Sequence, residues 1–237
     1  MDIKIIYEDE DVLVVDKPAG VVVFEEKPEH LNPLRRSTLI DLLIEKYPEL
    51  KNAGEAPRYG IVHRLDKDTS GILLVAKNTE ALIFLQKCFK NREVEKKYTC
   101  LVEGQMESEK GEIKTLIARA KGDPRKQRVY SPVDAPKSAK EATTEYKVVE
   151  KFKDYTLLEV QIKTGRRHQI RCHFSYLKHP VAGDKMYSFK NSKVPEGLER
   201  QFLHASYLKI QLPSGETKEF LSELPEELKK ILNKLEK

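Results

Sequence analysis

The sequence predicts an α+β fold built on a mixed, largely antiparallel sheet that is flanked by helices. Segments with strand character outnumber segments with helical periodicity along the 237 residues. Most neighbouring strand segments are joined by too few residues for a helical crossover, which favours antiparallel pairing. A hydrophobic fraction of 39% is enough to build a core, although 34% of the residues are charged.

The beginning of the chain is expected to hold three short strands. Residues 3–7 and 12–16 are β-type segments, the turn at 17–20 breaks the chain, and residues 21–24 form the third strand. Residues 25–36 carry proline and asparagine among charges and are expected to form a loop.

Two helices are expected next, one after residue 36 and one after residue 77. Ser37 is expected to cap the first helix, whose apolar positions recur at helical spacing and end at Pro48. A polar loop over residues 50–58 follows it. The apolar residues 72–76 read as a strand, after which Asn78 or the threonine beside it caps the second helix.

The middle of the chain is rich in strands. Residues 97–103, 112–119 and 143–149 are strand candidates, and residues 155–162 alternate as a half-buried strand does. The basic, proline-containing stretch 120–141 is expected to be a loop.

The chain from residue 166 to residue 237 is expected to hold two helices and a hairpin. A helix is predicted over residues 166–177, and residues 207–212 and 218–220 form a hairpin around Ser-Gly. Pro225 opens the final helix, which has glutamates in its first turn and lysines toward its end.

Composition limits the class of protein. The net charge is +5, and the longest apolar runs fall far short of the roughly 18 residues that a membrane span requires. The first residues lack the apolar core of a signal peptide, so we expect a cytoplasmic protein. The three cysteines are an odd number without a CxxC pair, which argues against a disulfide framework.

Residues 63–71 concentrate chemical groups beside an apolar strand. They include a histidine, two cations, two carboxylates and two hydroxyls. Charges packed this densely beside a buried strand either face a cleft or cap a turn. Asp68 and Thr69 are good turn formers, whereas the residues alone leave Asp66 open between a turn and a functional carboxylate.

Residues 164–173 lie where a strand ends and a helix begins. Helical spacing puts Arg167 and Arg171 on one face, and clustered guanidinium groups suit phosphate or carboxylate oxygens. Zinc is the rival ligand because histidines and a cysteine lie close together there. Arginines flank His168 and Cys172 and no second ligand pair exists elsewhere, so we expect no metal site.

Two basic segments indicate a polyanionic partner. Residues 87–98 carry a net charge of +3 and residues 119–128 a net charge of +4, with aromatic residues nearby. A basic face of this kind fits RNA, although a solvated lysine-rich surface is the commoner explanation of any single run.

Taken together, these segments resemble the RluA-type pseudouridine synthases from Asp11 to about Phe220. Residues 63–71 match the HRLDxxTSG element of that family, residues 96–104 its KxYxAxVxG strand, and residues 165–171 its GRxHQIR element. Three supporting segments lie at residues 16–20, 179–184 and 203–205. Six segments in order with compatible spacing make a strong resemblance.

The resemblance implies the isomerisation of specific uridines to pseudouridine in structured RNA, either rRNA or tRNA, without a metal or organic cofactor. Asp66 is implied as the catalytic carboxylate, acting either on carbon 6 of uracil or at the sugar. The target base has to leave the RNA stack, because the reacting atoms are inaccessible inside it.

The resemblance also assigns the remaining site residues. Arg171 and Tyr98 are implied as catalytic residues beside Asp66. Arg171 is implied to pair with Asp66 and keep it ionised, and Tyr98 to stack on the target base and to take part in proton transfer at carbon 5. Arg64 is implied to displace or hold the flipped nucleotide. His63, Arg166, Gln169 and Leu203 complete the expected substrate-binding set.

Two departures from the family pattern bear on the architecture. The glycine that usually follows Asp-x-x-Tyr is Ser188 here, so this loop is expected to differ. The RNA-binding module often fused ahead of the catalytic domain is expected to be missing. Residues 1–237 are therefore expected to be one catalytic domain that acts as a monomer, without a membrane or an obligatory protein partner.

Two rival functions remain. Asp66 with Arg171 has the chemistry to cleave a glycosidic bond outright, which would release free uracil. A non-catalytic RNA-binding or ribosome-assembly protein would keep the fold without turnover. A pure binder has no need of a carboxylate in a phosphate-facing site, which favours the isomerase.

Overall fold

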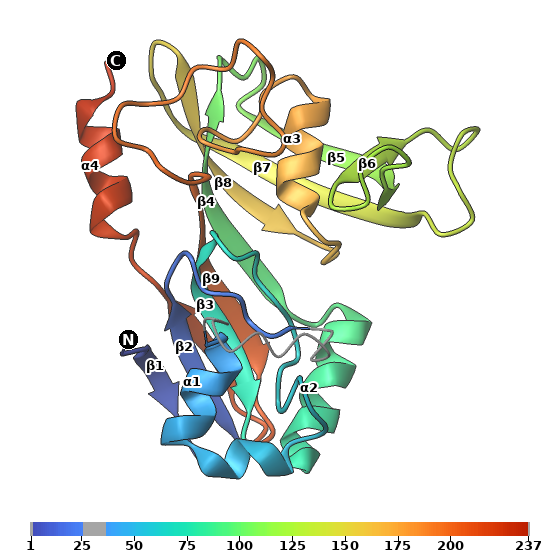
Figure 1. Ribbon diagram of the computed structural model, residues 1–237, viewed down its shortest axis with the longest axis vertical. Coiled ribbons are helices and arrows are strands. Elements are labelled where there is room, and N and C mark those ends of the chain that lie inside the picture. Colours follow the sequence, from blue (N-terminus) through green and yellow to red (C-terminus); the bar gives the residue numbers. More distant parts are fainter. Residues whose placement is uncertain (1, 26–36, 237) are drawn as a thin grey trace. The chain divides into compact units, whose positions relative to one another are not determined.

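The computed structural model describes residues 2–25 and 37–236 and divides the chain into two compact units (Figure 1). Unit 1 comprises Met1–Glu95 and Ala205–Glu223, and unit 2 comprises Lys96–His204 and Leu224–Lys237. Both units combine largely antiparallel strands with helices. The expected α+β class is therefore confirmed.

Unit 1 is built on strands that pair in the order β1, β2, β3, β9. These strands are β1 (Lys4–Glu8), β2 (Val12–Lys17), β3 (Ser70–Ala76) and β9 (Leu203–Gln211), which starts in unit 2. The last strand, β10 (Thr217–Leu221), pairs antiparallel with β9 and completes the expected hairpin.

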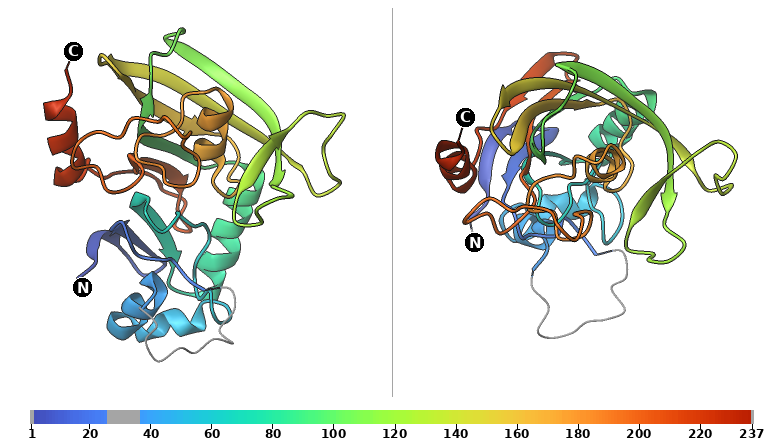
Figure 2. Two further views of the ribbon diagram at one scale, coloured as in Figure 1. Left: turned by 45° about the horizontal axis from the view of Figure 1, so that its top comes forward. Right: turned by 90° about the horizontal axis from the view of Figure 1, so that it is seen from above.

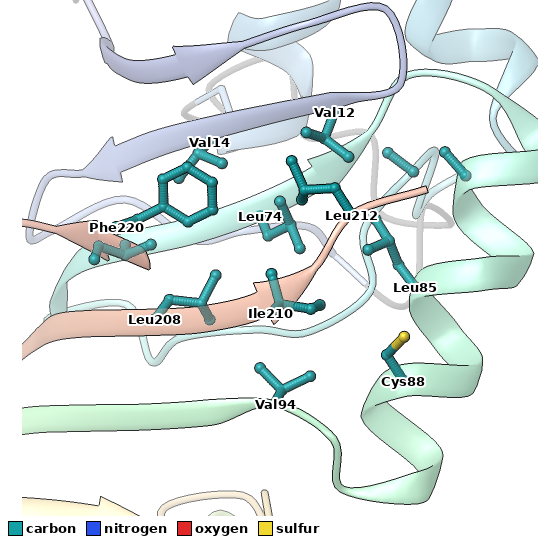
Figure 3. Close-up of a cluster of buried hydrophobic side chains, with 13 residues drawn as sticks. Val12, Val14, Leu74, Leu85, Cys88, Val94, Leu208, Ile210, Leu212 and Phe220 are labelled. Atoms are coloured by element: carbon teal, nitrogen blue, oxygen red, sulfur yellow. The ribbon is translucent and has the colours of Figure 1, made fainter. Parts of the chain in front are cut away.

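The core of unit 1 lies between this sheet and helix α2 (Thr79–Asn91) (Figure 3). Leu85 and Cys88 on α2 belong to the same buried cluster as Leu74 of β3 and Ile210 of β9. The side chain of Asn78 accepts a hydrogen bond from the amide of Ala81 at 2.8 Å and caps the helix, as the sequence predicts.

Helix α1 (Leu39–Lys46) is capped by Thr38 rather than by Ser37. The hydroxyl of Thr38 accepts from the amide of Asp41, and the carboxylate of Asp41 accepts from the amide of Thr38 at 2.9 Å. This reciprocal arrangement is a capping box, and it sets the first turn one residue later than expected. A 3-10 turn (Pro48–Asn52) replaces the first part of the expected polar loop.

The expected strand at residues 21–24 is wrong. The carbonyl oxygens of Val22 and Val23 accept hydrogen bonds from the amides of Leu39 and Ile40, at 2.8 and 3.1 Å. These carbonyls therefore satisfy the first amides of α1 instead of pairing in a sheet. The expected loop at residues 25–36 lies, except for its first residue, outside the described residues.

Unit 2 is an antiparallel sheet in the order β4, β8, β7, β5, β6. Its strands are β4 (Glu95–Glu103), β8 (Tyr155–Ile162), β7 (Lys140–Lys151), β5 (Lys110–Arg119) and β6 (Gln127–Tyr130).

The expected loop over residues 120–141 contains strand β6, so this prediction is partly wrong. The strand pairs with β5 from Leu116 opposite Tyr130 to Arg119 opposite Gln127. Four residues are too few for their alternation to stand out between basic and turn-forming neighbours.

Two helices pack on unit 2 (Figure 2). Helix α3 (Gln169–Tyr176) lies on β6 and β7. Helix α4 (Glu226–Lys234) buries Leu228 and Ile231 in a cluster that includes Leu101 of β4 and Phe202. None of the helices in the described residues has both the length and the apolar character needed to cross a bilayer.

Candidate active site

The segment that carries Asp66 is a tight turn fixed to the neighbouring loop of unit 1. The carbonyl oxygen of Asp66 accepts from the amide of Thr69 at 3.1 Å. The next carbonyl, that of Lys67, accepts from the amide of Gly20 at 2.9 Å and from Lys17 Nζ at 3.0 Å. The peptide beside Asp66 is therefore held from two directions.

Lys17 is a fully buried cation that links the two loops. Its ammonium group donates to the carbonyl oxygens of Pro18 and Val21, each at 2.9 Å, as well as to that of Lys67. Three carbonyl dipoles replace the water that a buried ammonium loses. The Lys17 turn and the Asp66 turn therefore form one block, on which the Asp66 side chain is half-buried.

Gly71 allows the strand after Asp66 to approach β9 closely. Its φ of +112° favours glycine, and a Cβ atom at this position would lie 2.2 Å from the carbonyl oxygen of Ala205. A larger residue would push β3 away from β9. The glycine of the HRLDKDTSG segment is therefore required by packing.

His63 supports the backbone of β3. Its Nε2 accepts from the amide of Leu74 at 3.0 Å, and its ring stacks on Phe89 with centroids 4.8 Å apart. An accepting Nε2 carries no proton, so this bond is made by the neutral imidazole. A role of His63 toward substrate remains a prediction.

Arg64 lies on an aromatic platform that the sequence analysis missed. The guanidinium groups of Arg64 and Arg58 lie 5.1 and 4.9 Å from the centroid of the Phe24 ring. Both arginines are exposed, whereas Phe24 is buried. Arg58 and Phe24 stand outside the recognised motifs, so no sequence signal marked them.

In unit 2, Arg171 is held by a carboxylate that the sequence analysis gave no role. Arg171 donates from Nε to Oδ2 of Asp184 at 2.6 Å and from Nη2 to Oδ1 at 2.9 Å. Asp184 is fully buried and also accepts from the amides of Met186 and Tyr187, at 2.9 and 3.0 Å. The guanidinium plane is therefore fixed by a two-point ion pair.

The turn that presents Asp184 explains both the glycine before it and the departure at Ser188. A Cβ atom on Gly183, whose φ is +74°, would lie 2.3 Å from the carbonyl oxygen of Arg200. The amide and the hydroxyl of Ser188 both donate to the carbonyl oxygen of Asp184. The serine therefore strengthens this turn with a side-chain bond that glycine cannot make.

The guanidinium of Arg171 lies over the ring of Tyr187. The guanidinium carbon lies 5.1 Å from the ring centroid, within the range of a cation–π contact. The Tyr187 hydroxyl accepts from the amide of Gln127 at 2.7 Å and lies 3.0 Å from Nδ1 of His168. Burial raises the pKa of the Tyr187 phenol, so it stays protonated at neutral pH.

Tyr98 lies on the face of the unit 2 sheet that α3 covers. It pairs with Val160, which pairs in turn with Tyr146, and paired residues share a face. The Tyr146 ring meets that of Phe174 on α3, with centroids 5.9 Å apart. Tyr98 itself is 7% exposed.

Gln169 joins the start of α3 to strand β7. Its Oε1 accepts from the hydroxyl of Thr164 at 2.7 Å and from the amide of Arg166 at 3.0 Å. Its Nε2 donates to the carbonyl of Thr143 and the hydroxyl of Thr144, each at 3.0 Å. The buried amide thus sets the helix that carries Arg171, and its substrate contact remains a prediction.

His173 of α3 adds further buried polar contacts between this helix and strands β5 and β7. Its ring nitrogens lie 2.9 Å from the hydroxyls of Thr115 and Thr144, and the side chain is fully buried. Burial lowers the pKa of His173 to about 4, so the ring is neutral at physiological pH. Among the residues that the structure describes, no group of His, Cys, Asp and Glu side chains could hold a metal ion.

The expected site residues are distributed over both units. His63, Arg64 and Asp66 belong to unit 1, and the others belong to unit 2. Arg166 donates from Nε to the carbonyl oxygen of Glu141 at 2.9 Å, and Leu203 is buried at the start of β9. The expected pairing of Asp66 with Arg171 remains a prediction.

A family model described as RNA pseudouridylate synthase matches residues 11–176, which include the Asp66 turn, Tyr98 and Arg171. The chain belongs to the RNA pseudouridine synthase family. It is 43% identical over 243 residues to an uncharacterized RNA pseudouridine synthase of Aquifex aeolicus (strain VF5), covering 99% of this chain and 73% of that protein. It is 35% identical to the ribosomal large subunit pseudouridine synthase D of Yersinia pestis, covering 98% of this chain and 70% of that protein.

A comparison with solved structures indicates the same family. The human RNA pseudouridylate synthase domain containing 1 matches 94% of this chain with a TM-score of 0.76 and 29% identity, over 84% of its own length. The RluA-type resemblance is confirmed, and this pseudouridine synthase is an isomerase that acts on uridine in RNA.

Proposed function

We propose that this pseudouridine synthase modifies specific uridines in structured rRNA or tRNA with Asp66 as its catalytic carboxylate. The observation that supports Asp66 most strongly is the block that carries it. Lys17 and Gly20 fix the peptide next to Asp66, while the side chain itself is only half-buried. A catalytic group has to be positioned without being sealed from its substrate.

The reaction exchanges one bond of uridine for another. The bond from C1′ to N1 breaks and a bond from C1′ to C5 forms, while N1 gains a proton and C5 loses one. Asp66 contributes either as a nucleophile at carbon 6 of uracil, as a nucleophile at the anomeric carbon, or as a base that removes a neighbouring sugar proton. A carboxylate is competent in each role.

The other proposed site residues orient the Asp66 carboxylate and hold the uracil base. We propose that Arg171 keeps Asp66 ionised and oriented, that Tyr98 stacks on the uracil, and that Arg64 holds the flipped nucleotide. Flipping is a physical requirement, because the glycosidic bond and carbon 6 are shielded in stacked RNA.

The surrounding residues are proposed to act mainly by shaping this site. The side chain of His63 forms a hydrogen bond with the protein backbone. The side chain of Gln169 forms hydrogen bonds with a buried hydroxyl and with a backbone carbonyl. Arg166 and Leu203 complete the proposed substrate-binding set. We further propose that residues 1–237 work as one catalytic domain, as a monomer in the cytoplasm, without a cofactor.

The test is nucleoside analysis of unmodified rRNA and tRNA transcripts incubated with the purified protein in excess chelator. Pseudouridine should rise as uridine falls, without free uracil. Free uracil would indicate a glycosidase, and binding without either product would indicate a non-catalytic RNA-binding protein. Pseudouridine maps of total RNA from cells with and without the gene would then identify the target position.

A further inference from the structure

Tyr187 joins two features of unit 2 that lie far apart in the sequence. Its ring lies against the guanidinium of Arg171, and its hydroxyl accepts from the amide of Gln127 on β6. The Tyr187 and His168 rings also meet edge to face, with centroids 5.7 Å apart. One side chain therefore contacts α3, the residue before α3, and strand β6.

The Tyr187 ring and the Asp184 carboxylate constrain the Arg171 guanidinium in complementary ways. Asp184 binds the edge of the guanidinium through two hydrogen bonds and sets its plane. The same group lies over the Tyr187 ring, with its central carbon 5.1 Å from the ring centroid, and this contact restricts its movement. The amide of Tyr187 also donates to Asp184 at 3.0 Å, so both restraints come from a single turn.

The hydroxyl connects this turn to a strongly basic hairpin. Gln127 lies between Lys126 and Arg128 in the segment 119–128, which carries a net charge of +4. This hairpin closes on itself, since the amide of Ala120 donates to the carbonyl of Lys126 at 3.0 Å. Phosphate contacts on the hairpin would therefore act on the strand that holds the Tyr187 hydroxyl.

We infer that Tyr187 is a positioning residue that holds Arg171 through its ring and couples it to the basic hairpin through its hydroxyl. The inference rests on the proposed role of Arg171 in catalysis. It assigns the RNA backbone bound at the hairpin a second effect, namely to stabilise the reactive orientation of the arginine.

The test is a double-mutant cycle read by tritium release from RNA that carries tritium at carbon 5 of uridine. Tyr187→Phe keeps the ring but removes the hydroxyl, and it is made both in the wild type and in Arg171→Lys. With enzyme in excess, Tyr187→Phe should lower the single-turnover rate about tenfold in the wild type and less than twofold in Arg171→Lys. The dissociation constant for the RNA should stay within twofold of the wild type.

Tyr130→Phe is the matched control. The hydroxyl of Tyr130 donates to the carbonyl oxygen of Arg119 at 3.0 Å, so this variant loses one tyrosine hydrogen bond in the same hairpin. Its rate should stay within twofold of the wild type. Equal rate losses for Tyr130→Phe and Tyr187→Phe, or an undiminished loss in Arg171→Lys, would overturn the inference. A wild type that releases no tritium would instead refute the proposed function.

Discussion

Asp184 and Arg171 form a buried two-point ion pair, with Nε 2.6 Å from Oδ2 and Nη2 2.9 Å from Oδ1. A buried pair of this kind contributes orientation more than net stability, because removing both charges from water offsets most of their attraction. Removing only one partner is different. It leaves a charge in the interior without compensation.

Asp184→Asn should therefore destabilise the protein strongly. The substitution keeps the shape of the side chain but leaves the buried guanidinium without its counter-charge, which should cost about 3 kcal/mol of unfolding free energy. Chemical denaturation measures this cost. Asp123→Asn is the control, because Asp123 forms a 2.9 Å ion pair with exposed Arg125 and its loss should cost far less unfolding free energy. Equal losses in the two variants would contradict the buried-pair interpretation.

His173 should make the protein sensitive to acid. Its folded pKa of about 4 lies below the ordinary value of 6.5, so the unfolded chain binds more protons between these pH values. Stability should therefore fall as the pH drops from about 6.5 to about 4, by up to about 3 kcal/mol from this residue.

Denaturation curves at a series of pH values check this prediction against His173→Gln. The glutamine variant lacks a titrating ring, so its stability relative to the wild type should improve as the pH falls through that window. Parallel curves would show that carboxylates alone cause the acid sensitivity.

Lys17→Met should loosen the block that carries Asp66. Methionine fills a similar volume but leaves the carbonyl oxygens of Pro18, Val21 and Lys67 without the ammonium donor, at a cost of about 2–4 kcal/mol. Thermal melts and the single-turnover rate should both decline. Lys67→Met removes an exposed ammonium group from the same block and should leave the melting temperature nearly unchanged.

The basic hairpin should set RNA affinity more than the choice of uridine. Charge reversal at Arg125, Lys126 and Arg128 should weaken binding and reduce its dependence on salt, because fewer counterions are released. Arg125 already pairs with Asp123 at 2.9 Å, so reversal of the other two charges should account for most of the effect. Filter binding at several salt concentrations measures both quantities. A triple variant with normal affinity and an unchanged salt slope would contradict the prediction.

Much of the fold followed from local sequence patterns. The strand at Tyr155–Ile162 and the cap at Asn78 were predictable because alternation and capping are local signals. The wrong secondary-structure predictions lie where tertiary contacts determine the local conformation. The carbonyl oxygens of Val22 and Val23 accept hydrogen bonds from the first amides of α1, and β6 is held by its pairing with β5.

The supporting layer of the site was beyond sequence reasoning. Arg171 was marked by its motif, but its carboxylate partner Asp184 lies 13 residues away on a separate turn. Tyr187 reaches Gln127 across 60 residues, and spacing carries no information at that range. The sequence motifs therefore located the proposed catalytic residues, whereas the contacts that orient these residues became visible only in the structure.

Asp66→Asn is the direct test of Asp66 as the catalytic carboxylate. The variant is nearly isosteric and loses one negative charge, so it should fold and bind RNA at least as well as the wild type. It cannot act as a carboxylate nucleophile or base. Asp68→Asn, in the same segment, is the control. Its rate should stay within about fivefold of the wild-type rate, which corresponds to about 1 kcal/mol of activation free energy.

The measurement is single-turnover conversion of a labelled uridine, with filter binding and thermal melts run on each variant. Asp66→Asn should bind RNA and melt normally but form no detectable pseudouridine. Appreciable pseudouridine formation by well-folded Asp66→Asn would contradict the assignment of Asp66 as the catalytic carboxylate.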